Sequence, residues 1–536
     1  MTSFLRTKKI PVGESVQEIL EIGTNIDSTF PSMFWLFMGA PRHSAKTCAG
    51  ERVAQIYRRT GAKIIYVCDQ KDEIEPAFSM FEPEAEYHKN EMKFRNEQPE
   101  TFNVRINHPY TQNIPNRREP ETNYFSLPIK SALQDNMIKF ILEDERENTA
   151  FNLLKMSVND LKSTEGLFAL AHNLRKNADK SETYSVFMTE EAGTGIQFAK
   201  DMEMKLTNLF MDDYILMPES HPDNLDMKRI LKDKDVVDVF TTRHFAKSEK
   251  KKDLITFYLL EEIQANKQFI PKEGLSVVVQ EIKDLCPQKP MGYKMIFINT
   301  FNSLITKCGS SKLGVIADTQ SESGTNSKLM TLFNQKFAGK TLSNSDLHNY
   351  ATNFKFSKDC IDMIKKLNLG EFIRVDKSGD NSYAKFAMPC FMHHEEGVSF
   401  DKIYEKHFPE KMKSYSHIVG LIKEHIYEQR MHFKGIIDTK KSREIEQMQR
   451  KLKESQRKQD DSEKVKLLKE ELAEKKAREK DERDRKVLEL HKDYPLLKSR
   501  KLSELLKDKY AISLSHTKIS QILNDSKKDG HTGAGN

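Results

Sequence analysis

Cysteine is scarce in this chain, and its distribution excludes two classes of site. The 536 residues contain six cysteines, and no two of them form a C-x-x-C pair. A zinc module and a disulfide framework both require closely spaced cysteines. The sequence therefore predicts neither of them, and we expect a protein of the reducing cytoplasm.

Long apolar runs are also missing. The longest ones, around Phe34 and Val277, have the length of a β-strand, whereas a membrane helix needs about 20 apolar residues. Near the N-terminus, Arg6, Lys8 and Lys9 are not followed by an apolar segment. The sequence accordingly predicts no membrane span and no signal peptide.

A strong excess of charge of one sign is absent as well, because the net charge is only +6. That value does not by itself indicate a nucleic-acid partner, so the distribution of the charge matters more. A chain of this length is too long to fold around one hydrophobic core, so the sequence predicts two or three domains. We expect a lead-in at 1–30, a main domain at 31–433 with an insertion at about 75–232, a charged helical arm at 434–490, a small helical domain at 491–527 and a disordered tail at 528–536.

The segment 34–73 is typical of a strand, a helix and a second strand. The apolar run Phe34–Met38 predicts a buried strand, and Gly39 begins the turn after it. A helix is expected from about Thr47 to Gly61, followed by a second apolar strand at Lys63–Cys68. This order indicates an α/β fold.

The turn before the helix has the residue types that bind a nucleoside triphosphate. Such a site needs backbone N–H groups at a helix N-terminus, a lysine near the outer phosphates and a hydroxyl for Mg²⁺. The candidate nucleotide-binding residues are Ala40, Arg42, His43, Ser44, Ala45, Lys46 and Thr47. Alanine replaces both glycines of the G-x-x-x-x-G-K-[ST] pattern, so a plain strand-to-helix turn stays open as the alternative.

Two later strands are expected to end in polar residues at the same edge of the sheet. GLSVVVQEIKDLCP predicts a buried strand that delivers Gln280 and Glu281, and the strand Leu313–Ala317 delivers Asp318. Glu281 is the candidate that activates the attacking water, and Gln280 occupies the place of a magnesium-binding acid. Asp318 is a candidate replacement for that acid. The alternative is a core strand that ends in ordinary polar residues.

Together these segments resemble the FtsK–HerA superfamily of DNA-pumping ATPases, nearest to the HerA and conjugative coupling-protein branch. The resemblance rests on the order of IIYVCDQKDE, VVVQEIKDLCP, LGVIADTQ and LNLGEFIRV. It implies a RecA-like P-loop NTPase fold that binds ATP and Mg²⁺ through Lys46 and Thr47. It also implies catalysis by Glu281, with Gln320 as the sensor of the γ-phosphate.

The same resemblance implies partners. Members of the superfamily usually form hexameric rings that act on double-stranded DNA, and an arginine of the neighbouring subunit commonly completes the site. Arg243 and Arg374 are the two candidates for this arginine finger. A nuclease or another processing protein is a further implied partner.

The remaining segments carry less chemistry. The polar stretch 75–124 predicts a loop, 125–232 predicts an inserted helical region, and 16–22 predicts a short amphipathic helix. Cys390, His393, His394 and Glu395 crowd together, but adjacent histidines rarely converge on one metal ion, so we predict no metal site there. No metal other than Mg²⁺ is expected.

The C-terminal region predicts a helix-turn-helix of the winged type. A helix with Leu502 and Leu506 on one face is followed by a turn and by a second helix capped by Ser515. The exposed face of the second helix would contact DNA through His516, Thr517, Lys518, Ser520 and Gln521. A small helical oligomerisation unit is the alternative. Before this region, the charged arm is more typical of a solvated helix than of a stable coiled coil.

The sequence thus predicts an ATP-driven DNA translocase or packaging motor. The rival hypothesis is a P-loop protein that has lost catalysis and acts as a DNA-binding scaffold or regulator. The alanines at positions 40 and 45 and the neutral Gln280 favour the rival.

Overall fold

The computed structural model divides the chain into two compact units, Met1–Lys423 and Glu424–Asn536. The structure describes residues 5–12, 15–22, 34–40, 45–69, 93, 103–111, 113–114, 117–143, 149–185, 205–206, 215–245, 248–308, 312–375, 382–385, 402, 405–406, 408–415, 417–420, 422–424, 427, 431, 447, 462–495, 497–510 and 512–529. No helix within these ranges is both long and apolar enough to cross a bilayer.

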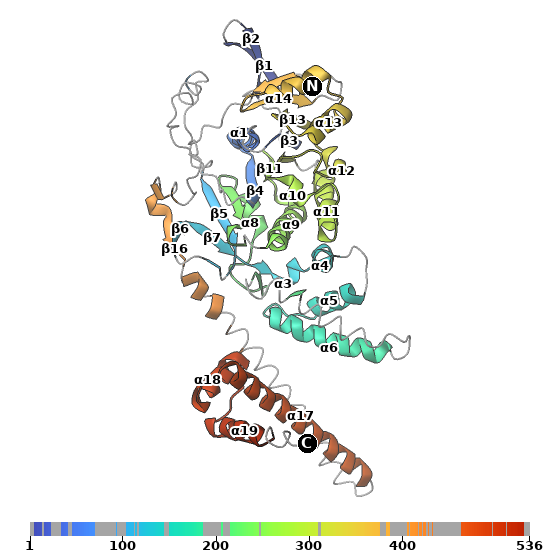
Figure 1. Ribbon diagram of the computed structural model, residues 1–536, viewed down its shortest axis with the longest axis vertical. Coiled ribbons are helices and arrows are strands. Elements are labelled where there is room, and N and C mark those ends of the chain that lie inside the picture. Colours follow the sequence, from blue (N-terminus) through green and yellow to red (C-terminus); the bar gives the residue numbers. More distant parts are fainter. Residues whose placement is uncertain are drawn as a thin grey trace, which may run out of the picture. The chain divides into compact units, whose positions relative to one another are not determined.

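A ten-stranded sheet organises the first unit, with its strands in the order β15-β14-β13-β3-β12-β11-β4-β10-β5-β7 (Figure 1). The strands are β3 (Phe34–Met38), β4 (Lys63–Asp69), β5 (Val104–Pro109), β7 (Thr122–Phe125), β10 (Val237–Thr241), β11 (Leu275–Val279), β12 (Leu313–Thr319), β13 (Gln335–Gly339), β14 (Glu371–Val375) and β15 (Ser382–Lys385). The strands from β13 to β7 are parallel, and β14 and β15 add an antiparallel edge. Strand β12 lies between β3 and β11, which gives the RecA-like P-loop NTPase sheet that the sequence predicted.

Helices connect the strands and lie on both sides of the sheet (Figure 1). They are α1 (Lys46–Arg59), α3 (Ile129–Ala132), α4 (Asp135–Leu142), α5 (Thr149–Asn159), α6 (Leu167–Ser185), α8 (Met227–Lys232), α9 (Glu249–Ala265), α10 (Ile282–Leu285), α11 (Tyr293–Cys308), α12 (Ser327–Met330), α13 (Asn344–Asn353) and α14 (Lys358–Lys366). Helix α1 packs against β3, β4, β11 and β12, while α9 packs on β4 and α11 on β12. Because α1 follows β3 directly, its N-terminus lies at the carboxyl edge of the parallel strands.

The core between α1 and the sheet is aromatic and aliphatic. Trp35, Phe37 and Phe337 stack on one another, and Phe372 packs edge-on against Phe37. The indole of Trp35 is 1% exposed, and its N–H donates to the hydroxyl of Tyr57 at 3.0 Å. This packing fixes β3 and α1, the two elements that flank the predicted phosphate-binding turn.

Two predictions about secondary structure were wrong. Strands β5 and β7 extend the main sheet within the stretch predicted to be a loop, and β1 (Leu5–Val12) pairs with β2 (Ser15–Ile22) as an antiparallel hairpin in place of the predicted helix. Arg105 and Asn107 of β5 and Asn123 of β7 make hydrogen bonds to other strands, so these strands mix polar with apolar residues and lack the continuous apolar run that marks a buried strand. Pairing between segments outweighs such weak local patterns.

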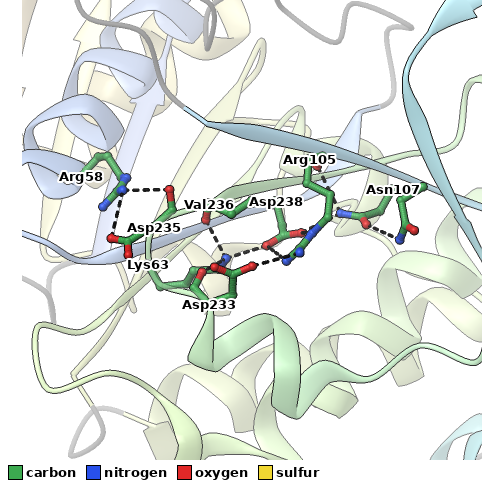
Figure 2. A network of polar contacts seen from close by, with 9 residues as sticks. Arg58, Lys63, Arg105, Asn107, Asp233, Asp235, Val236 and Asp238 are labelled. Carbon is green, nitrogen blue, oxygen red and sulfur yellow. Dashed lines mark hydrogen bonds and ion pairs between the residues drawn. The ribbon is translucent and has the colours of Figure 1, made fainter. Parts of the chain in front are cut away.

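A buried polar network ties the amino ends of β4, β10 and β5 together (Figure 2). Lys63 and Asp238 are fully buried, and their Nζ and Oδ2 atoms lie 2.5 Å apart. Arg105 donates to both carboxylate oxygens of Asp238, at 2.6 and 3.0 Å, and Asn107 donates to Oδ1 at 2.8 Å. Burial lowers the pKa of the Lys63 ammonium, and the negative charge of Asp238 acts in the opposite direction. The network sets the register of the strands at the edge opposite the predicted site.

The second unit contains α17 (Ser462–Asp493), α18 (Ser499–Tyr510) and α19 (His516–Asp529). Its core joins Val487 and Leu490 of α17 to Leu502 and Leu506 of α18 and to Ile519 and Ile522 of α19. The C-terminal end of α17 takes part in this core, and the residues of the helix from 469 to 482 are mostly exposed. The predicted charged helix is therefore present in this part of the arm and is largely solvated.

Candidate functional site

Helix α1 begins at the residue pair that was predicted to hold phosphate and magnesium. Lys46 is its first residue, and Ala45 precedes it with φ 51° and ψ 37°. This left-handed conformation favours glycine, so alanine costs about 1–2 kcal/mol at this position. The Lys46 side chain is buried, and its Nζ lies 3.4 Å from the carbonyl oxygen of Ala40. Position 45 thus has a glycine-type backbone conformation although the residue is alanine.

Asp318 connects the three elements that form the site. Its Oδ2 accepts a hydrogen bond from the hydroxyl of Thr47 at 3.0 Å, and its Oδ1 accepts one from the backbone N–H of Glu281 at 2.6 Å. Asp318 is 5% exposed and lies on β12, the strand adjacent to β3. One carboxylate therefore links helix α1 to the end of β11.

Glu281 is held in a defined position at the end of β11. It is 4% exposed and has φ 47°, a second left-handed residue that is not glycine. The side-chain amide of Gln320 donates to its Oε1 at 2.7 Å. The structure thus brings Thr47, Asp318, Glu281 and Gln320 together in one hydrogen-bonded chain.

Gln280 faces a small cavity beside this chain. Its side chain is 6% exposed and lines the cavity together with Thr47, Glu51 and Asp318. Within the described part of the chain, the Oε1 atom of Gln280 has no hydrogen-bond partner. Carboxylate, hydroxyl and amide oxygens are the ligand types that Mg²⁺ binds. Thr47, Asp318 and Gln280 therefore fit a magnesium site at the head of α1.

Glu51 is the residue that sequence reasoning missed. It is 3% exposed and lies one helical turn after Thr47, so both side chains are on the same face of α1. A buried acid one helical turn after Thr47, the predicted magnesium-binding hydroxyl, is a signal that the sequence did contain.

Arg243, one of the two arginine-finger candidates, forms a buried ion pair within the chain. Its Nη2 lies 2.8 Å from Glu119 Oε2, and both side chains are buried. Burial alone would raise the pKa of the Glu119 carboxyl, but the hydrogen bond to His244 and the charge of Arg243 hold it below its usual value. The fully buried His108 has a pKa well below its usual value because of burial and the nearby His244 and Arg243. Arg243 thus links β10 to Glu119 of the neighbouring segment, and an arginine finger at Arg243 or at Arg374 on β14 stays a prediction.

Several predicted residues lie outside the described part of the chain. They are Arg42, His43 and Ser44 of the turn, and Cys390, His393, His394 and Glu395 of the cluster for which no metal was predicted.

The second unit presents the predicted face of its last helix. Ser515 caps α19 by accepting a hydrogen bond from the N–H of Lys518 at 3.3 Å, as expected. His516, Thr517 and Gln521 are exposed, and Lys518 donates to Gln521 Oε1 at 3.0 Å. Residues 497–529 include eight basic and four acidic side chains. This surface has the charge and the polar groups that suit a nucleic acid.

Comparison with known proteins identifies similar solved structures. The plasmid coupling protein TrwB in complex with ADP and Mg²⁺ is 12% identical, with a TM-score of 0.45 over 73% of this chain and 98% of that chain. VirB4 of Thermoanaerobacter pseudethanolicus is 13% identical, with a TM-score of 0.42 over 72% of this chain and 96% of that chain. The genome packaging NTPase B204 from Sulfolobus turreted icosahedral virus 2 is 13% identical, with a TM-score of 0.23 over 30% of this chain and 73% of that chain.

No protein-family model matches the chain, and no curated protein matches it in sequence.

Proposed function

We propose that this protein binds ATP with Mg²⁺ at the head of α1, hydrolyses it, and uses the energy to move double-stranded DNA. The observation that supports the proposal most directly is the connection of Thr47 to Glu281 through Asp318. In a P-loop NTPase these are the places of the metal-binding hydroxyl, a metal-binding acid and the water-activating glutamate. The missing acid of β11 is thus offset by an acid one strand away.

Each side chain has a defined task in this proposal. The Lys46 ammonium and the N-terminus of α1 bind the phosphates, because both present positive charge there. Thr47, Asp318 and Gln280 hold Mg²⁺, which neutralises the charge that develops on the phosphate oxygens. Glu281 accepts the proton of the attacking water, and Gln320 orients the Glu281 carboxylate through their 2.7 Å hydrogen bond.

A ring completes the proposal. We expect subunits to assemble as a hexamer in which Arg374 of one subunit approaches the nucleotide of the next. Hydrolysis of ATP by the purified chain, and its loss in Lys46→Ala, tests the proposal. If the unaltered protein binds DNA but does not hydrolyse ATP, the scaffold hypothesis is favoured. The neutral Gln280 is the residue that supports this hypothesis.

For the second unit, we propose that α19 enters the major groove of the DNA. Gln521→Ala is expected to weaken binding to a preferred duplex by about 1–3 kcal/mol, because a base-edge contact is lost. Lys501→Ala is expected to weaken binding to all sequences, because one phosphate contact is lost. The slope of the logarithm of the binding constant against the logarithm of the salt concentration should fall by about one. Fluorescence anisotropy with labelled duplexes at several salt concentrations measures both effects.

Lys476→Ala is the matched control for these variants, since Lys476 is exposed on the solvated part of α17. It should bind every duplex as the unaltered protein does. Equal binding by all three variants would place the DNA contact on another part of the protein.

A further inference from the structure

We infer that the first unit binds the phosphate backbone of double-stranded DNA through a basic surface at the amino edge of its sheet. This lysine surface consists of six exposed residues, which are Lys228, Arg229 and Lys232 of α8, Lys267 of the 3₁₀-helix η5 (Lys267–Phe269), Lys272 and Lys312. The inference rests on the proposed function for its choice of partner, and it adds a DNA contact to the one proposed for α19.

The topology of the sheet brings these residues to one edge. Helix α8 ends shortly before β10, η5 and Lys272 precede β11, and Lys312 directly precedes β12. Strands β10, β4, β11 and β12 are parallel neighbours, so the segments before them lie at the same amino edge. The Nζ of Lys312 donates to the carbonyl oxygen of Lys272 at 2.7 Å. The proposed nucleotide site is at the opposite edge, roughly 17 Å away along a strand of five residues.

Phe269 holds two of the lysines in place. The Nζ of Lys228 lies 4.7 Å and the Nζ of Lys232 lies 5.1 Å from the centroid of its ring. An ammonium group within about 6 Å of an aromatic centroid is attracted to the ring. Two like charges four residues apart on a helix repel each other, so their joint placement costs stability. A bound phosphate would offset this repulsion.

The acids in the same segments have other partners. Segments 226–235 and 267–273 contain six basic and four acidic residues. The contacts of the acids are Asp226 with the N–H of Arg229, Asp233 with Arg105, Asp235 with Arg58 and Glu273 with Lys234, and the second and third can be followed in Figure 2. In the described part of the chain, Lys228 and Lys232 form no ion pair with a carboxylate. The surface therefore keeps a positive charge, which suits a polyanion.

The apolar side chains of this region point to a nucleic acid rather than a lipid bilayer. Met227, Ile230 and Leu231 of α8 are buried, and Phe269 is partly buried and in contact with the two ammonium groups. A helix that binds a bilayer surface inserts exposed apolar residues into it. Duplex DNA needs no such insertion and offers a phosphate about every 3.4 Å along each strand. Neighbouring lysines can therefore bind neighbouring phosphates.

The test is the binding of a labelled duplex of random sequence to the full-length protein without nucleotide, followed by fluorescence anisotropy at several salt concentrations. K228Q/K232Q is expected to bind about tenfold more weakly at low salt, because two phosphate contacts are lost. The slope of the logarithm of the binding constant against the logarithm of the salt concentration should become shallower by about two. K228R/K232R keeps both charges and should bind as the unaltered protein does.

K358Q/K366Q is the matched control, since both lysines are exposed on α14, which packs on β14 near the other end of the strand order. It should keep the affinity and the slope of the unaltered protein. Equal binding by the two glutamine variants would overturn the inference. Weaker binding by K228Q/K232Q with an unchanged slope would also overturn it, because that result indicates altered packing of α8 and not lost phosphate contacts.

Two further outcomes separate this inference from the rival partner and from the proposed motor. If K228Q/K232Q loses binding to vesicles that contain phosphatidylserine but keeps its affinity for the duplex, the surface binds lipid and the inference is wrong. If the shallower slope is found in a protein that hydrolyses no ATP, the inference holds and the proposed motor fails.

Discussion

Replacing Asp318 with asparagine is expected to lower ATP turnover by about two to three orders of magnitude, because a preorganised charge at the reacting phosphate is lost. The two oxygens of Asp318 accept hydrogen bonds from Thr47 and from the backbone of Glu281. Asparagine has one acceptor oxygen, which can keep the Glu281 N–H, and its NH₂ group can donate to the Thr47 hydroxyl in place of accepting from it. The variant thus keeps the connection between α1 and the end of β11 but removes the negative charge from the metal site.

The measurement is steady-state hydrolysis as a function of Mg²⁺ concentration. Asp318→Asn should need more Mg²⁺ and should have a lower maximal rate, while its affinity for ADP in EDTA stays unchanged. Asp362→Asn on α14 is the control, since Asp362 is about half exposed and pairs with Lys365. Normal turnover and normal metal dependence in Asp318→Asn would show that Asp318 does not replace the missing acid.

Asp238→Ala is expected to lower the free energy of unfolding of the first unit by about 3–5 kcal/mol, the usual effect of removing one partner of a buried ion pair. Lys63 and Asp238 are both 0% exposed, and Arg105 shares the same carboxylate (Figure 2). Without Asp238, the Lys63 ammonium keeps only the carbonyl oxygens of Asp233 and Val236. Two positive charges then remain close together at the sheet edge.

Trp35 makes this prediction measurable, because it is the single tryptophan of the chain and lies in the core of the sheet. Its fluorescence during urea unfolding reports on the first unit. Asp235→Ala is the control: the side chain of Asp235 is 82% exposed, and its pair with Arg58 spans 3.8 Å, so about 0.5 kcal/mol or less is expected. If Asp238→Ala and Asp235→Ala unfold at the same urea concentration, the network does not stabilise the sheet.

The sequence predicted the central strands and the turn between β3 and α1 because these segments have strong local patterns. The apolar runs at 34–38, 275–279 and 313–317 became β3, β11 and β12. Lys46 and Thr47 lie at the start of α1, and the polar residues after β11 and β12 meet at one edge, as parallel strands require.

The parts that the sequence did not predict depend on contacts between distant segments. Strand β5 contains Arg105 and Asn107, which pair with Asp238 of β10 across a gap of more than 100 residues in the sequence. The buried ion pair of Arg243 with Glu119 also joins segments far apart in the sequence, so the sequence alone did not predict it. Asp318 was a candidate replacement for the metal-binding acid, and its hydrogen bond to Thr47 required knowledge of which strands are neighbours.

The measurement that tests the central claim most directly is ATP hydrolysis by the purified protein with and without double-stranded DNA, beside Lys46→Ala and Glu281→Gln. The proposed motor predicts turnover that DNA stimulates and that both variants abolish. Both variants should still fold, as shown by the fluorescence of Trp35. The contrary result is an unaltered protein that binds DNA but turns over no ATP in either condition, and it would leave a P-loop scaffold in place of the motor.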